Sequence, residues 1–283
     1  MTPLLRAAAL NNRTVGISVS ESPDLSRLGL LESHVTVILG EIARVVLASG
    51  GTLAYGGHLD PGGYTAFLLS ELQRYGHRGP DPLLKVYLAC SEHQRLTRDE
   101  LEQRLTVGVW GKVVCLDLEG RVIPDPFNGR SPAAGPELDD TQKRDALTAM
   151  RRVMAEETDG RVLLGGKRSG FSGALPGLME EALLTLKAGT PLYLAAGLGG
   201  VTADIVRALS IDDCAWLPPV PDASPDDPRL VTGRNLLMAE RKAQEWGGLR
   251  NGLSDDENRR LAATHRPGEI ATLVGLGLGR LAA

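Results

Sequence analysis

The chain alternates between two patterns of hydrophobic residues. Short, continuous apolar runs predict strands buried on both faces, whereas longer segments with apolar residues three and four positions apart predict amphipathic helices. The predicted strands are residues 14–20, 52–55, 83–90, 112–118, 161–166 and 191–197. The predicted helices are residues 33–51, 64–75, 139–157, 175–188 and 201–209. Because strands and helices alternate, we expect an α/β fold, a Rossmann-like three-layer sandwich with a mostly parallel sheet.

Two segments rich in proline interrupt this alternation. Residues 123–138 are predicted to be a loop, and residues 217–229 a linker or surface loop, after which the chain is mainly helical. We therefore expect a short N-terminal tail (1–12), one Rossmann-like domain (13–216), and a Pro-rich connection with a helical C-terminal extension (217–283) that packs on the same domain.

Composition narrows the class of partner. With a net charge of −4 and only 4% aromatic residues, the chain lacks the clustered cations and stacking side chains that nucleic-acid binding requires. The three cysteines are far apart and are expected to stay reduced. The N-terminal stretch is too short and polar for a signal peptide, and no run of about 18 apolar residues predicts a membrane span. We expect a cytoplasmic protein without nucleic-acid or membrane partners.

Two predicted strands end in a Gly-Gly pair, and the residues that follow are similar. The first glycine motif is AYGGHLDPGGYTAFL (54–68), and the second is LLGGKRSGFSGALPGLMEEAL (163–183). In an open α/β sheet, ligands bind beyond the carboxyl ends of the strands, where glycine permits close approach and free helix amides favour an anion such as phosphate. Lys167 and Arg168 are predicted to neutralise that phosphate. The alternative is that each glycine pair forms only a tight turn.

The ligand-binding residues predicted in these two motifs come from both loops and from the helix starts. They are Gly56, Gly57, His58, Gly62, Gly63, Tyr64, Gly165, Gly166, Lys167, Arg168, Ser169, Gly173, Pro176 and Gly177.

Two further segments follow predicted strands. Ser18, Ser20 and Glu21 follow or end the first strand and are predicted to bind phosphate or ribose, with a simple turn as the alternative. Gly199 in GLGG, after the strand at 191–197, is a similar candidate. The sequence GLGLG (275–279) resembles a dinucleotide motif, but no helix can follow it in the residues that remain. We interpret it as a helix end or tail.

Glu180 and Glu181 are the candidate catalytic residues. A carboxylate here could act as general acid or base on a ribosidic bond, or could bind a ribose hydroxyl. Acidic residues also favour the first turn of a helix for reasons of charge alone. Because neighbouring helical residues point about 100° apart, we expect at most one of them to face the ligand. The five histidines lack metal-binding spacing, so no metal site is predicted.

These motifs resemble those of the SLOG superfamily. This Rossmann-like group includes the LOG (lysine decarboxylase-like) phosphoribohydrolases, the DNA-processing Smf proteins and bacterial conflict-system sensors. The resemblance rests on YGGHLDPGG, on GGKRSGFSGALPGLMEEA, and on NGLSDDENRRLAATHRPGEIATLV, which is similar to the tail of SLOG domains associated with TIR and Sir2 enzymes. It covers most of the chain from about Arg13. It implies a nucleotide or nucleotide-sugar ligand at the glycine motifs.

The chain departs from the LOG hydrolases in one respect. Those enzymes carry PGGxGT followed closely by a catalytic Glu, whereas PGGYTAFLLSEL here lacks the second glycine before Thr65, and Glu71 lies farther along. Glu180 or Glu181 is near the expected place in the second motif, without the GGxGT portion. The resemblance therefore favours ligand sensing over hydrolysis.

Three functions follow from these observations. The SLOG resemblance implies a sensor of an NAD- or ADP-ribose-like molecule, including cyclic forms, that acts in a bacterial signalling or defence system. It would require no cofactor, would form a homodimer or higher oligomer, and would act on an effector protein in trans. The alternative is a nucleotide N-glycosidase or phosphoribohydrolase of the LOG type, with Glu180 or Glu181 as the catalytic residue. A third is an oligomerising scaffold in which the glycine motifs are only turns.

Overall fold

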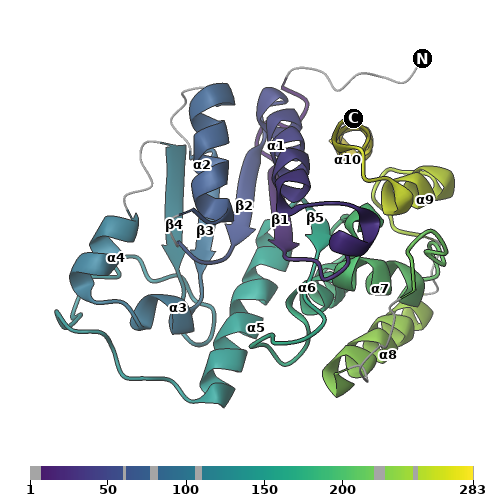
Figure 1. Cartoon of the computed structure of the whole chain (residues 1–283). Coiled ribbons are helices and arrows are strands. Elements are labelled where there is room, and N and C mark those ends of the chain that lie inside the picture. The colour runs from purple at the N-terminus through teal and green to yellow at the C-terminus, as the bar shows by residue number, and fades with distance from the viewer. Residues whose placement is uncertain are drawn as a thin grey trace.

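A parallel sheet forms the centre of the molecule. The structure, a computed structural model, describes residues 8–59, 62–76, 82–105, 110–219, 227–244 and 248–282. In this part of the chain the strands are β1 (Thr14–Ser20), β2 (Thr52–Gly56), β3 (Leu84–Leu88), β4 (Gly111–Cys115), β5 (Gly160–Gly165) and β6 (Leu192–Ala195). They form one six-stranded sheet in the order β4-β3-β2-β1-β5-β6, and every neighbouring pair is parallel (Figure 1). The predicted fold class is confirmed.

The strand β1 shows why the central strands are apolar along their whole length. Val15 and Ile17 are fully buried in the same hydrophobic cluster as the apolar side of α1. A Cβ at Gly16, which points to the other face, would contact Thr158 and Arg161. Because helices cover both faces, solvent imposes no alternation of apolar and polar residues on these strands.

The helices agree with the predicted ones, with two additions. They are α1 (Glu32–Ala48), α2 (Tyr64–Tyr75), α3 (Cys90–Gln94), α4 (Arg98–Leu105), α5 (Asp140–Glu157), α6 (Gly177–Lys187), α7 (Gly200–Ala208), α8 (Pro228–Ala243), α9 (Asp255–Ala263) and α10 (Pro267–Ala282). The sequence analysis does not predict α3 and α4. The helix α3 is little more than one turn, and α4 buries only Leu101, so neither shows the apolar period of a helix.

Helices cover both faces of the sheet, so the molecule has three layers. On one side of the sheet, α1 packs against α2 and α10, and Figure 1 shows α1 and α2 in front of the strands. On the other side, α5, α6 and α7 contact the strands, and α8 packs on α6 and α7. No helix in the described part of the chain combines the length and the apolar character needed to cross a membrane.

The C-terminal helices are joined to the sheet by polar contacts as well as by packing. The buried Asn251 donates from Nδ2 to the carbonyl oxygen of Leu192 at 2.8 Å, and the Tyr193 hydroxyl donates to the carbonyl of Asn251 at 2.8 Å. Ser254 caps α9, and Glu257 pairs with Arg280 of α10 at 2.7 Å. Much of the segment NGLSDDENRRLAATHRPGEIATLV therefore has a structural role.

Several predicted boundaries differ from the structure. The strand predicted at 83–90 ends at Leu88, and Cys90 already belongs to α3; the strand predicted at 191–197 ends at Ala195. The linker at 217–229 overlaps the start of α8, which begins at Pro228, and residues 220–226 lie outside the described residues. The sequence GLGLG (275–279), interpreted as a helix end or tail, lies within α10. A Cβ at Gly277 would lie 2.5 Å from Cε1 of Tyr193 and 2.6 Å from the carbonyl oxygen of Asn251. This glycine is thus explained by close packing.

We predict that Gly277→Ala lowers the free energy of unfolding by about 1–3 kcal/mol, because the added methyl group overpacks a rigid contact. The matched control is Gly268→Ala in the same helix, where a Cβ meets nothing within 4 Å. Alanine is the better helix former, so this control should be neutral or slightly stabilising. Urea unfolding of both variants measures the difference, and similar stabilities would contradict the packing role of Gly277.

Candidate functional site

The two glycine motifs lie at one edge of the sheet. The strand β1 pairs with β2 on one side and with β5 on the other, all parallel, so their carboxyl ends share an edge (Figure 1). The loops after β2 (57–63, the first glycine loop) and after β5 (166–176, the second glycine loop) therefore leave this edge on either side of β1; residues 60 and 61 lie outside the described residues. The strand order reverses between β1 and β5, which is the usual place for a ligand crevice.

Direct contacts join the loop after β1 to the second glycine loop. The amide of Gly166 donates to the carbonyl oxygen of Ser20 at 3.2 Å. Lys167 Nζ lies 3.0 Å from Glu21 Oε2, and both side chains are largely exposed. Ser20, Glu21, Gly166 and Lys167, all predicted ligand residues, are thus neighbours at the carboxyl edge.

Several of the predicted glycines are in close contact with the protein itself. A Cβ at Gly56 would lie 2.6 Å from Sδ of Met154. At Gly173 and Gly177, a Cβ would lie 2.8 Å and 2.9 Å from the guanidinium nitrogens of Arg151. By contrast, a Cβ at Gly62, which has φ +81°, would meet nothing within 4 Å. Internal packing therefore accounts for glycine at the first three positions, while Gly62 faces open space.

Arg168 is held inside the protein. Its Nη1 donates to both carboxylate oxygens of Asp24 at 2.8 Å, its Nε to Asp204 at 2.7 Å, and its Nη2 to the carbonyl of Gly200 at 3.0 Å. The side chain of Arg168 is 19% exposed, whereas that of Lys167 is 48% exposed. Of the two cations predicted to neutralise phosphate, Lys167 is the more exposed and Arg168 is already paired within the protein.

The side chain of Asp24, from the loop after β1, lies at the N-terminus of α7. Its Oδ2 accepts a hydrogen bond from the amide of Gly200 at 2.7 Å, and Gly199 lies directly against its side chain. Burial alone would raise the pKa of Asp24, but the bonds from Arg27, Gly200 and Arg168 outweigh it and hold the pKa below its usual value. The positive end of α7, where Gly199 is predicted to bind ligand, therefore faces an internal carboxylate.

Glu180 and Glu181 are the fourth and fifth residues of α6 and face different partners. Glu180 accepts hydrogen bonds from Thr148 and Arg151, both on α5, and is almost completely buried. Because the two side chains are offset by about 100°, Glu181 is directed toward β1 and β5 instead.

Glu181 bridges the sheet and α5. It accepts a hydrogen bond from the Ser18 hydroxyl on β1 and one from Arg161 Nη1 at 3.0 Å on β5. Arg151 Nε lies 3.5 Å from its other oxygen. Arg161 is completely buried, and its Nε and Nη2 have no hydrogen-bond partner among the described residues. Ser18 and Glu181, predicted separately, are thus brought into contact.

The sequence analysis does not predict Arg151, Arg161, Asp24 or Asp204 as part of this site. One signal was available, since Arg161 lies within the apolar strand 160–165, and a buried charge in such a strand must be paired. For the others, the pairing depends on contacts between distant segments, and no local pattern marks it.

Tyrosines and a histidine lie in and beside the first glycine loop. The Tyr64 hydroxyl donates to Glu32 on α1. Burial, together with the charge of Glu181, raises the pKa of Tyr55, whose ring lies against Gly57. Nδ1 of His58 lies 2.8 Å from Glu92 Oε2 on α3. This contact joins the first glycine loop to a helix that the sequence did not predict.

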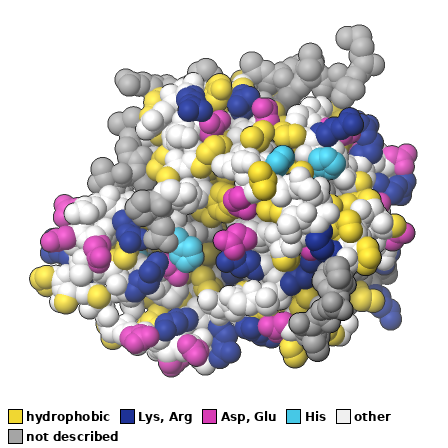
Figure 2. Space-filling model, in the orientation of Figure 1, with side chains coloured by type: hydrophobic (Ala, Val, Ile, Leu, Met, Phe, Trp, Pro, Cys, Tyr) yellow, Lys and Arg dark blue, Asp and Glu magenta, His cyan; other side chains and the backbone are white. Residues whose placement is uncertain are grey.

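The remaining predicted residues lie in the same loops. Gly63 and Ser169 are exposed, and Pro176 immediately precedes α6. Figure 2 shows acidic and basic side chains interspersed over one face of the molecule. Among the described residues, no group of three or more His, Cys, Asp and Glu side chains is arranged to hold a metal ion.

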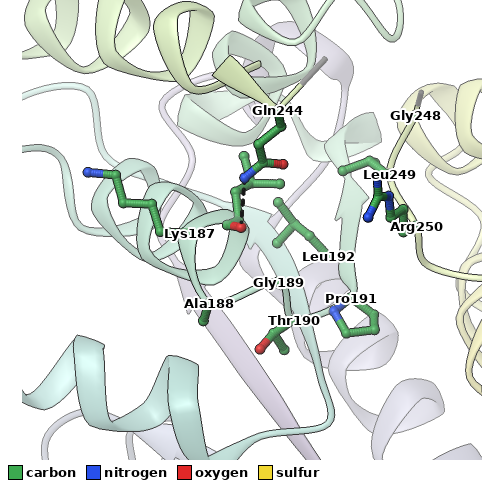
Figure 3. A pocket seen from close by; sticks show the side chains of 11 residues that line it. Lys187, Ala188, Gly189, Thr190, Pro191, Leu192, Gln244, Gly248, Leu249 and Arg250 are labelled. Carbon is green, nitrogen blue, oxygen red and sulfur yellow. Dashed lines mark hydrogen bonds between the residues drawn. The ribbon is translucent and has the colours of Figure 1, made fainter. Parts of the chain in front are cut away.

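A cavity of about 420 Å³ lies elsewhere, at the amino end of β6 (Figure 3). It is lined by the end of α6 with residues 187–192, and by the segment before α9, including Gly248 and Arg250. Gln244, the C-cap residue of α8, donates to the carbonyl of Leu186 at 2.9 Å. Since β6 runs parallel to β5, this cavity is at the opposite edge of the sheet from the glycine loops.

Comparison with known families agrees with the motif resemblance. A family model described as SLOG cluster2 matches residues 9–261, which is most of the chain. None of the curated proteins compared with the chain matches it.

We predict that Arg168→Ala lowers the free energy of unfolding by about 3 kcal/mol, because Asp24 and Asp204 are left buried with fewer partners. The matched control Lys167→Ala removes the neighbouring, exposed cation and should change stability by less than about 0.5 kcal/mol. Urea unfolding compares the two. Equal losses would contradict the internal role of Arg168.

The lowered pKa of Asp24 predicts a pH dependence. An ionised Asp24 stabilises the fold above its ordinary pKa of 3.8, and this contribution is lost as the pH falls through the lower folded-state pKa. Asp24→Asn cannot titrate. The difference in unfolding free energy between the wild type and Asp24→Asn should therefore shrink as the pH is lowered below about 4. Urea unfolding at several pH values tests this. If the difference between the two proteins does not vary with pH, titration of Asp24 does not contribute to the pH dependence of stability.

Proposed function

Because the chain belongs to the SLOG superfamily, we propose that it binds a nucleotide-derived small molecule of the NAD or ADP-ribose type at the carboxyl edge of its sheet. One observation carries this proposal, namely that both glycine loops leave the sheet beside β1, at the strand reversal. In folds of this kind the reversal is where nucleotides bind.

The ligand's phosphate would lie at the second glycine loop. Lys167 supports this, because it is the exposed cation of that loop and its acidic partner, Glu21, is also exposed. The start of α6, an eleven-residue helix, adds the positive end of its dipole. Ser20 and Ser169 would supply hydroxyl donors nearby.

The ribose and base would lie toward β1 and β2. Glu181 is the candidate contact for a ribose hydroxyl, because it is directed at Ser18 near the end of β1 while Glu180 is enclosed by α5. Tyr55 and Tyr64 offer aromatic surface and hydroxyl groups on the β2 side, where a nucleobase can stack. The ring of Tyr55 is mostly buried, so Tyr64 would present the larger face.

We favour sensing over hydrolysis. Both glutamates accept hydrogen bonds or ion pairs from the protein, and Arg151 contacts both. Such a network fixes carboxylates in place and suits recognition of a ligand that stays intact. The sensor would act in a bacterial signalling or defence system, as a homodimer or larger oligomer that signals to an effector protein in trans.

A second function, cleavage of an N-glycosidic bond, has one observation in its favour. Two carboxylates and two arginines are gathered near the carboxyl edge of the sheet, and a fixed carboxylate beside a ribose can stabilise the oxocarbenium-like transition state of such a reaction. In that case Glu181 or Glu180 would be the catalytic residue.

We expect ADP-ribose, cyclic ADP-ribose, NAD or AMP to raise the melting temperature of the purified protein. A ligand at about a hundred times its Kd adds about 2.7 kcal/mol to the free energy of unfolding. Lys167→Ala should weaken binding about tenfold by removing one charge-assisted contact. The matched control is Lys187→Ala at the far end of α6, which should bind as the wild type does.

Chromatography of the ligand after incubation with the protein distinguishes a sensor from a glycosidase. Recovery of intact ligand supports the sensor. Release of free base that stops in Glu181→Gln, with the variant still folded by circular dichroism, supports the glycosidase. If none of the four compounds stabilises the protein, the proposed nucleotide site is wrong. That result would favour the alternative that the chain is an oligomerising scaffold.

A further inference from the structure

The second glycine loop depends on side chains from other elements for its position. Residues 166–176 contain neither helix nor strand. Arg168, near the start of the loop, is tied to Asp24 and Asp204. A second tie, from the helix α8, reaches the middle of the loop.

Arg229, in the first turn of α8, makes this second tie. Its Nη1 donates to the carbonyl oxygens of Phe171 at 3.3 Å and Gly173 at 3.2 Å. Its guanidinium also stacks on the ring of Phe171, 4.0 Å from the ring centre. One side chain thus holds two loop carbonyls and one loop ring.

The guanidinium is itself held in place. Asp227, the N-cap of α8, accepts from Arg229 Nε at 3.1 Å and from Nη2 at 2.9 Å, which leaves Nη1 directed at the loop. The helix beneath is rigidly seated, because a Cβ at Gly233 would lie 2.2 Å from Sδ of Met179 on α6. Arg229, which holds the loop, is therefore fixed relative to α6, the helix that carries Glu180 and Glu181.

The part of the loop that Arg229 contacts lies beside the buried Arg151–Glu180 ion pair. A Cβ at Gly173 would lie 2.8 Å from Arg151 Nη1 and 3.4 Å from Glu180 Oε2. The backbone of Gly173 thus sits between Arg229 outside and the Arg151–Glu180 pair inside. Loss of the outer contact would free the loop to move away from that pair.

We infer that Arg229 is a positioning residue that orders the second glycine loop for the ligand, so that α8 forms part of the binding site. The functional half of this inference rests on the proposed nucleotide site, whereas the ordering of the loop does not. An ordered loop binds more tightly, because a ligand meets its competent conformation without first having to select it. Lysine could not replace Arg229, because it lacks the planar group that stacks while donating to two carbonyls.

Hydrogen–deuterium exchange of the free protein tests the ordering directly. Arg229→Met keeps an unbranched side chain but removes the guanidinium, and we expect amide exchange in residues 168–175 to become about tenfold faster. Arg229→Lys should show much of the same increase. The matched control is Lys242→Met, which removes an exposed cation from the same helix and should leave the loop unchanged. Because Arg229 is partly exposed, global stability by urea unfolding should stay within about 1 kcal/mol in all three variants.

Titration with ADP-ribose gives the second readout. We expect Arg229→Met to weaken binding about tenfold, in line with the lost loop order, and Lys242→Met to bind as the wild type does. Unchanged loop exchange in Arg229→Met overturns the inference, as does faster exchange with undiminished ADP-ribose affinity. If the wild type binds none of the nucleotide probes, the proposed function fails, and loop exchange in the free protein still decides whether Arg229 orders the loop.

Discussion

The arrangement of the carboxyl edge depends on the cost of burying charge. Arg161 is fully enclosed between the sheet and the helices, and Arg151, Glu180 and Asp24 are nearly so. A charge removed from water is tolerated only where opposite charges and hydrogen bonds surround it. Each of these groups therefore fixes a partner from a different segment, and together they tie β1, β5, α5, α6 and α7 into one unit. The loops that follow β1 and β5 are positioned by the same bonds, through Asp24 and Arg168.

This requirement also divides the polar residues of the edge into two sets. Arg168, Asp24 and Glu180 have their hydrogen-bonding capacity largely satisfied within the protein, whereas Lys167 and Glu21 remain exposed to solvent. The glycine positions divide in the same way, since Gly173 and Gly177 make room for Arg151 while Gly62 faces open space. A buried inner layer of paired charges thus supports a few exposed groups at the carboxyl edge.

The sequence predicts the sheet and the main helices well, because their apolar periods are set by burial alone. It misses α3 and α4, whose residues bury too little to leave a period, and it cannot identify which residues pair at the carboxyl edge. Glu180 and Glu181 are adjacent and chemically identical in the sequence. Only the positions of Arg151 and Arg161, fixed by packing of α5 and β5, assign one glutamate to the helix layer and the other to the sheet.

The packing of α10 on α1 has a consequence for how the chain folds during synthesis. Apolar side chains of α1 such as Ile38 and Ile42 share a cluster with Ile270 and Val274 of α10, although α1 follows the first strand and α10 follows the last. While the ribosome is still producing the intervening segments, the apolar side of α1 that packs on α10 has no cover. Contacts between segments so distant in sequence form late and slow folding. The growing chain therefore exposes the apolar side chains of α1 until α10 has been synthesised. Exposed apolar surface of this kind is what chaperones bind.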